Sequence, residues 1–213
     1  MPPSHPVHTT TRSRGYLPHR ESANPIYFVT FRLADSLPAE LIDRLREERK
    51  LLERASSARA CTPPDRERLR ELRETIRKAE RCLDGGLGRC HMREARIARI
   101  VADSLLHFEG KRHHIFAWCV MPNHVHAIFS PIGDYKLESV VHSWKSFSAQ
   151  SANRALGRTG AFWQREYFDH LIRNEASLEK IIQYVLDNPK KAGLKNWPWA
   201  GAGGSSNAAG VMP

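Results

Sequence analysis

Two apolar segments separated by three residues constrain the fold of this chain more than any other feature. Residues 113–120 (HHIFAWCV) and 124–129 (HVHAIF) are rich in β-branched and aromatic side chains, which favour strands. The Met121-Pro122-Asn123 segment between them is typical of a turn. We therefore predict a β-hairpin, around which the other elements must be arranged.

The segments on either side of this hairpin predict a mixed order of strands and helices. Residues 26–33 and 165–172 have strand patterns, and three segments have apolar residues at helical spacing, namely 93–108, 136–156 and 177–187. Ser177 is the expected cap of the last helix, and Pro189 lies just beyond its expected end. The order predicts an α+β, ferredoxin-like βαββαβ sandwich with a central antiparallel sheet and an added C-terminal helix.

Three peripheral segments differ in composition from the main domain, which we place at residues 25–200. Residues 1–24 are polar and basic, and we expect a flexible arm there. The charged segment 39–84 has thin apolar seams at helical spacing and predicts an inserted αα-hairpin that packs on the domain or projects from it. Residues 201–213 are rich in Gly, Ala and Ser, and we expect a disordered tail.

Composition favours some classes of protein and excludes others. No run of about 18 apolar residues is present, so a transmembrane helix is not expected, and the first residues lack the apolar region of a secretory signal. The four cysteines form no C-x-x-C pair, so we expect a reducing, cytoplasmic location and no disulfide scaffold. The net charge of +10 indicates a polyanionic partner, most often nucleic acid, although a basic surface can also serve solubility alone.

His124 and His126 are candidate metal ligands on the second strand of the hairpin. Residues two apart on a strand point to the same side, so two imidazoles can hold one divalent cation while Val125 points into the core. With 11 histidines in 213 residues, about half of one such pair is expected by chance. The spacing alone is therefore equally compatible with two histidines on a half-exposed strand.

Tyr184 and Asn188 lie four residues apart in the last predicted helix and therefore share a face. A tyrosine oxygen can attack a phosphodiester and form a covalent phosphotyrosine, and Asn188 could supply a third oxygen or nitrogen ligand to a metal. The alternative for Tyr184 is a structural one, in which the ring packs at the edge of the apolar stripe and the hydroxyl contacts water.

Several segments together resemble the single-tyrosine HUH transposases, and most of all the REP-associated tyrosine transposases of bacteria. These segments are YFVTFRL (27–33), AWCVMPNHVHAIF (117–129), HSWKSF (142–147), FWQREYFDHLIR (162–173), YVLDNPKKAGL (184–194) and WPWA (197–200). The resemblance implies cleavage of single-stranded DNA near a hairpin, with Mg²⁺ or Mn²⁺ at the histidine pair. His124 and His126 match the metal-binding histidines, Tyr184 the nucleophile and Asn188 the polar residue one turn later. The DNA 5′ end would remain on the tyrosine and a free 3′-OH could later reverse the reaction.

Six residues in or beside these segments are candidate DNA contacts: Lys145, Trp163, Arg165, Arg173, Lys190 and Lys191. The basic side chains suit phosphate but could equally be solvated charges, and the tryptophan could stack on an unpaired base or anchor the core. The expected partner is single-stranded DNA with REP-like hairpins, and no membrane. Whether the chain acts as a monomer or a homodimer stays open. Two alternatives remain, a non-catalytic protein that binds hairpin DNA or RNA, and a metal-dependent phosphodiesterase that uses water.

Overall fold

The computed structural model describes residues 25–38, 40–43 and 85–203, two short strands within residues 11–20, and scattered positions from 67 to 83. Most of the predicted helical insert and residues 204–213 of the predicted tail lie outside the described residues. Among the residues that are described, no helix combines the length and the apolar character needed to cross a membrane.

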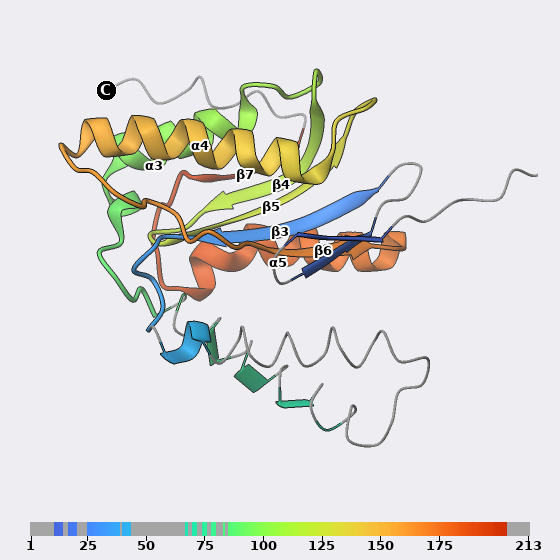
Figure 1. The fold of residues 1–213 in the computed structure, drawn as a ribbon, viewed down its shortest axis with the longest axis horizontal. Coiled ribbons are helices and arrows are strands. Elements are labelled where there is room, and N and C mark those ends of the chain that lie inside the picture. Colours follow the sequence, from blue (N-terminus) through green and yellow to red (C-terminus); the bar gives the residue numbers. More distant parts are fainter. Residues whose placement is uncertain are drawn as a thin grey trace, which may run out of the picture.

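A five-stranded antiparallel sheet forms the centre of the molecule (Figure 1). Its strands are β3 (Ile26–Arg32), β4 (His113–Val120), β5 (His124–Pro131), β6 (Phe168–Ile172) and β7 (Ala200–Ala202), in the order β6-β3-β5-β4-β7. The first four strands in this order have the arrangement of a ferredoxin-like sandwich. The predicted fold class is thereby confirmed.

The predicted hairpin is present as β4 and β5. Val120 pairs with Val125 across the turn, and Met121 N donates to the His124 carbonyl oxygen at 2.8 Å. On its other side β5 pairs with β3, and this register places Thr30 opposite His126 and Arg32 opposite His124. The two central strands therefore determine which polar residues lie next to the histidines.

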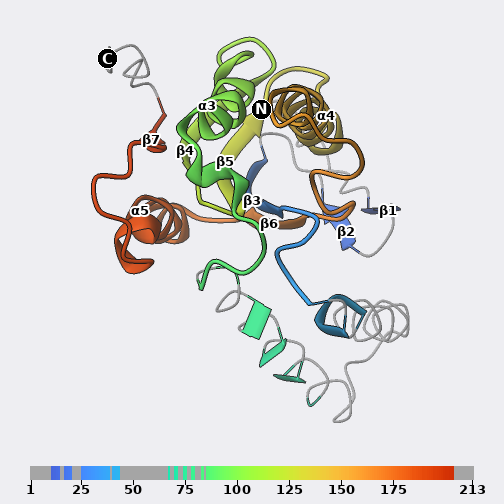
Figure 2. The same ribbon diagram turned by 90° about the vertical axis from the view of Figure 1, so that its left-hand side faces the viewer.

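Helices cover both faces of the sheet (Figures 1 and 2). Helices α3 (Ala95–Leu106) and α4 (Leu137–Ala155) lie on one face, where Val125 and Phe129 join the main core. Helix α5 (Glu175–Lys191) lies on the opposite face, where its Val185 packs in a second core with Ile128. Since α5 carries the predicted nucleophile, the second face is where the candidate chemistry must lie.

The ends of α5 differ from the prediction. Asn174, and not Ser177, is the N-cap, and its Oδ1 accepts a hydrogen bond from Ser177 N at 2.9 Å. Asparagine caps a helix as well as serine does, so the local pattern did not distinguish them. Pro189 lies inside the last turns of the helix, where its missing N–H removes a single hydrogen bond. Asn188 therefore remains one helical turn beyond Tyr184.

The start of the predicted disordered tail is instead an edge strand. Ala200, Gly201 and Ala202 pair with Cys119, Trp118 and Ala117 of β4. A Cβ on Gly201 would lie 3.1 Å from Trp118 Nε1, so the small residues let this segment lie close against the indole. The Gly-rich composition indicated disorder, but the open edge of β4 supplies backbone partners that composition does not reveal.

The two predicted additions contain regular backbone where it is described. β1 (Thr11–Arg14) and β2 (Leu17–Arg20) pair antiparallel within the arm for which no regular structure was expected. In the insert, a small apolar cluster joins the two ends of the segment, formed by Leu37, Leu41, Ile42, Ala79 and Leu83. A helical hairpin requires such contact between its two ends. The described positions of the insert lie away from α3 and α4 (Figure 1).

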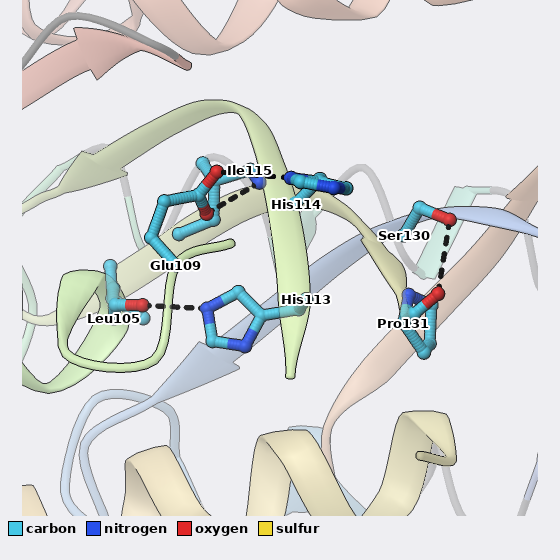
Figure 3. A network of polar contacts seen from close by, with 7 residues as sticks. All are labelled: Leu105, Glu109, His113, His114, Ile115, Ser130 and Pro131. Atoms are coloured by element: carbon cyan, nitrogen blue, oxygen red, sulfur yellow. Dashed lines mark hydrogen bonds and ion pairs between the residues drawn. The ribbon is translucent and has the colours of Figure 1, made fainter. Parts of the chain in front are cut away.

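A polar network fixes the far end of β4, where the chain enters the strand from α3 (Figure 3). The buried His113 ring lies with Nε2 2.8 Å from the Leu105 carbonyl oxygen, and Glu109 Oε2 accepts from Ile115 N at 2.8 Å. Burial lowers the pKa of His113, so this imidazole is neutral, and its buried Nδ1 has no hydrogen-bond partner among the described residues. His113 therefore has a structural role, at the opposite end of β4 from the hairpin turn.

Candidate active site

The two histidines of β5 lie on the sheet face that α5 covers. Val125, Ala127 and Phe129 point into the main core, whereas Ile128 belongs to the core under α5. Because side chains alternate along a strand, His124 and His126 share the face of Ile128. Their side chains are 1% and 4% exposed, so both imidazoles are removed from bulk water. The predicted same-side placement is confirmed, and the half-exposed alternative is wrong.

The hydrogen bonds of the pair aim its two Nε2 atoms at each other. These atoms are 3.0 Å apart. His124 Nδ1 lies 2.7 Å from Asn123 Oδ1, and an amide oxygen can only accept, so we assign the His124 proton to Nδ1. His124 therefore presents a lone pair at Nε2. His126 Nδ1 lies 2.8 Å from Thr30 Oγ1.

Thr30 allows His126 to hold its proton on either nitrogen, because a hydroxyl both donates and accepts. Without a cation, His126 Nε2–H donates to His124 and the Thr30 hydroxyl donates to His126 Nδ1. When a cation binds, His126 Nδ1–H can donate to Thr30 and both Nε2 lone pairs become available. The hydrogen bonds to Asn123 and Thr30 are kept in both states, so the surroundings of the pair suit metal binding.

The two imidazole nitrogens lie within reach of one divalent cation. Their 3.0 Å separation is that of a hydrogen bond in the absence of a cation, so it does not distinguish one metal from another. In the described part of the chain, no three His, Cys, Asp or Glu side chains gather as a metal group. Asn188 is 2% exposed, and its buried Oδ1 has no hydrogen-bond partner among the described residues. An amide oxygen of this kind is a suitable third ligand for Mg²⁺ or Mn²⁺.

Electrostatics keep both imidazoles neutral. Burial lowers the pKa of His126 to about 3. The pKa of His124 is well below its usual range because of burial first, and then because of His126 and the nearby Arg32 guanidinium. Since only a neutral imidazole can bind a metal, the pair is in its metal-binding form throughout the physiological pH range.

Tyr184 reaches this pair from α5. Its ring centroid lies 5.5 Å from that of His126 and 6.1 Å from that of Phe28, both in edge-on geometry. The Lys191 ammonium nitrogen lies 5.3 Å from the centre of the tyrosine ring. Helix α5 thus brings a phenol to the histidines and a positive charge to the phenol ring, with the buried Asn188 one turn further along.

The candidate DNA contacts divide into two groups. Arg165, Arg173, Lys190 and Lys191 are exposed. Lys145 instead donates to the carbonyl oxygens of Gln164 and Arg165, both at 2.8 Å, and thereby holds the segment before β6.

Trp163 does not offer a face to a base in this structure. It is 6% exposed, its Nε1 donates to Ser148 Oγ at 3.0 Å, and its ring packs edge-on against Phe31. The stacking interpretation is wrong for this residue, because the indole is used in the core.

Asn123 and Thr30 were missed in the sequence although both contact the histidines. Asn123 had a signal, since it is the polar residue of the turn directly before His124. Thr30 had none, because its position opposite His126 depends on the pairing of strands that are far apart in the chain.

Comparison with known proteins found similarity over the segment that carries this site. Residues 94–188 match the family described as "Transposase IS200 like". The matched segment covers less than half of this chain. It runs from the start of α3 to Asn188 and contains His124, His126 and Tyr184, so the resemblance seen in the sequence is confirmed.

Two curated relatives are similar over part of their length. The REP-associated tyrosine transposase of Escherichia coli is 32% identical over 91 residues, which are 40% of this chain and 52% of that protein. A protein of Haemophilus influenzae that provisionally carries the same name is 29% identical over 99 residues, which are 39% of this chain and 56% of that protein. The chain thus spans about half the length of the curated relatives that it matches.

One solved structure, described as a REP-associated tyrosine transposase bound to a REP hairpin, covers 90% of this chain and 81% of its own. Its sequence identity is 18% and its TM-score is 0.46.

Proposed function

We propose that this protein cuts and rejoins single-stranded DNA next to hairpins, through a covalent bond between Tyr184 and the 5′ end of the cut strand. The proposal rests on the position of Tyr184 beside the histidine pair. The centroid of its ring lies 5.5 Å from that of His126, and the Nε2 atoms of His124 and His126 are 3.0 Å apart. A histidine pair alone suits many metal sites. A phenol placed beside it suits phosphoryl transfer to tyrosine.

In the proposed reaction, each bond that forms at phosphorus is matched by one that breaks. The Tyr184 hydroxyl loses its proton, and its oxygen forms a bond to the scissile phosphorus while the bond from phosphorus to the 3′ oxygen breaks. The leaving 3′ oxygen takes up a proton and becomes a 3′-OH. Attack by a 3′-OH on the phosphotyrosine reverses these steps and restores Tyr184. The number of phosphoester bonds is unchanged, so rejoining needs no nucleotide cofactor.

His124, His126 and Asn188 would hold Mg²⁺ or Mn²⁺, which when bound neutralises charge on the scissile phosphate. Asn123 fixes the imidazole of His124 and keeps its Nε2 lone pair directed at the site. Phe28 packs edge-on against Tyr184 and limits the positions of the ring. The positive charge of Lys191 beside that ring stabilises the attacking phenolate.

Exposed basic side chains beside β6 and at the end of α5 supply the contacts to DNA. Arg165 and Arg173 flank β6, and Lys190 and Lys191 end α5. Each can bind a backbone phosphate, which positions the strand without selecting its sequence. The net charge of +10 adds a general attraction for the DNA polyanion.

The test is a cleavage assay on labelled single-stranded hairpins taken from the DNA around the gene, with Mg²⁺ or Mn²⁺, analysed on a denaturing gel. The parent protein should give a labelled protein–DNA band that is lost in Tyr184→Phe and in EDTA. Tyr135→Phe is the matched control, because Tyr135 is exposed and lies just before α4, away from the histidines.

The two alternatives give different results in the same assay. Nicking by Tyr184→Phe at the parental rate would show that water is the nucleophile and would refute the covalent mechanism. Hairpin binding without cleavage in either metal would refute the enzymatic proposal and favour a DNA-binding protein.

A further inference from the structure

A second concave site lies beside the turn that precedes His124, between the segment before α3 and the end of α4. It is a cavity of about 650 Å³ lined by Arg89, His91, Glu94, Leu156 and Arg158. None of these residues belongs to the histidine and tyrosine site. The cavity brings two arginines, one imidazole, one carboxylate and one apolar side chain to the same opening.

Two hydrogen bonds hold the Arg158 guanidinium in position and use only some of its N–H donors. Its Nη1 donates to His91 Nε2 at 3.3 Å, and its Nη2 donates to the Ala161 carbonyl oxygen at 3.2 Å. A guanidinium carries five N–H donors, so these contacts fix the group and leave others for a ligand. His91 accepts at Nε2 and is therefore neutral there, in agreement with a pKa that burial and Arg158 lower.

Arg89 is placed at the cavity by a tightly built loop. Its backbone N–H donates to Asp35 Oδ2 at 3.0 Å. The preceding Gly88 has φ +85°, and a Cβ there would lie 2.6 Å from the Asp35 carbonyl oxygen, so glycine is required. The close approach of Gly88 to Asp35 therefore fixes the position of Arg89 at the cavity.

The charge of the cavity is positive although it contains a carboxylate. Glu94 Oε2 accepts from both Arg96 Nε and Arg96 Nη2 at 2.9 Å, so Arg96 already balances its charge. Among the described residues neither Arg89 nor Arg158 forms an ion pair, although the Asp35 carboxylate lies at the backbone N–H of Arg89, and Leu156 adds an apolar wall. A phosphodiester with its sugar matches this combination, because guanidinium groups bind phosphate oxygens in pairs.

The cavity is connected to the candidate active site through hydrogen bonds. Asn123 Nδ2 donates to the Leu87 carbonyl oxygen at 2.9 Å, and Met92 N donates to the Pro122 carbonyl oxygen at 3.1 Å. The loop that carries Arg89 is therefore bonded to the turn directly before His124. We propose that this cavity binds a backbone phosphate of the unpaired DNA strand that enters the active site. The identity of the ligand rests on the proposed function.

The test measures equilibrium binding of a fluorescein-labelled DNA hairpin with a single-stranded flank, in EDTA and at several salt concentrations. Arg89→Gln and Arg158→Gln should each weaken binding about tenfold, as expected for loss of a charged hydrogen bond. Each should also reduce the slope of log K against log salt by about 0.7 to 0.9. Arg158→Lys should keep the salt slope but bind more weakly, because the paired donors are lost. Lys111→Gln is the control, since Lys111 is exposed at the opposite end of β4.

The change in salt slope separates a phosphate contact from a merely structural role, and thermal melting of each variant shows that it is folded. Parental affinity and salt slope in folded Arg89→Gln and Arg158→Gln would overturn the inference. Because no cleavage takes place in EDTA, the result is independent of the covalent step. A parent protein that forms no Tyr184 adduct, together with weaker binding by both arginine variants, would refute the proposed function and still support this inference.

Discussion

The buried histidine pair predicts that the metal-free protein loses stability as the pH falls below 6.5. The pKa of His126 is about 3 in the folded protein and about 6.5 in an unfolded chain. Between these values the unfolded state binds a proton that the folded state does not, so acid favours unfolding. This stability is fully present above pH 6.5 and is lost progressively as the pH falls toward 3.

The size of the effect follows from the two pKa values. Between pH 7.5 and pH 5, His126 alone lowers the free energy of unfolding by about 2 kcal/mol. The buried His124 acts in the same direction, because its pKa is also well below the usual range. About 2 kcal/mol is a large part of the total stability of a domain of this size.

Urea unfolding in EDTA at pH 7.5 and pH 5 measures this effect when the parent is compared with His126→Gln. Glutamine does not titrate, so the variant should show about 2 kcal/mol less change in the free energy of unfolding between the two pH values. The comparison cancels the titration of groups that do not interact with His126. His142→Gln is the control, because His142 is exposed on α4 and should leave the pH dependence unchanged. Equal pH dependence in His126→Gln and the parent would refute the assignment of a buried, neutral pair.

Three further outcomes follow from named contacts. Asn123→Ala should weaken Mn²⁺ binding by about 10- to 100-fold in calorimetric titration, because His124 loses the partner that orients it; unchanged affinity would contradict that role. Trp163→Ala should cost about 3 to 5 kcal/mol of stability in urea unfolding, whereas full stability with weaker DNA binding would restore the stacking interpretation. Gly201→Ala should cost about 1 to 3 kcal/mol, because its Cβ would press on Trp118, and a neutral effect would mean that β7 is not seated against the indole.

The elements that the sequence predicted well are those whose pattern is local. The observed β4 covers residues 113–120, as predicted, because an uninterrupted apolar run ends at a turn containing proline. β7 was missed because Ala200, Gly201 and Ala202 have no alternating apolar pattern. Their strand conformation comes from the open edge of β4, which lies far away in the sequence.

The candidate site was likewise predictable only where its residues follow a local pattern. Alternation along one strand was enough to place His124 and His126 on one side, and helical spacing was enough to place Tyr184 and Asn188 on one face. Only the packing of α5 on the second face of the sheet joins these two pairs. The spacing within each pair carries no information about that packing, so the family resemblance was needed to connect them.

Mass spectrometry of the protein–DNA adduct tests the central claim most directly. The parent protein, incubated with a cleavable hairpin and Mn²⁺ and then digested, should yield one modified peptide that contains Tyr184 joined to the 5′-phosphate of the DNA. The released DNA fragment should end in a 3′-OH. Cut DNA with a free 5′-phosphate and no modified peptide, or an adduct on any other residue, would contradict the account.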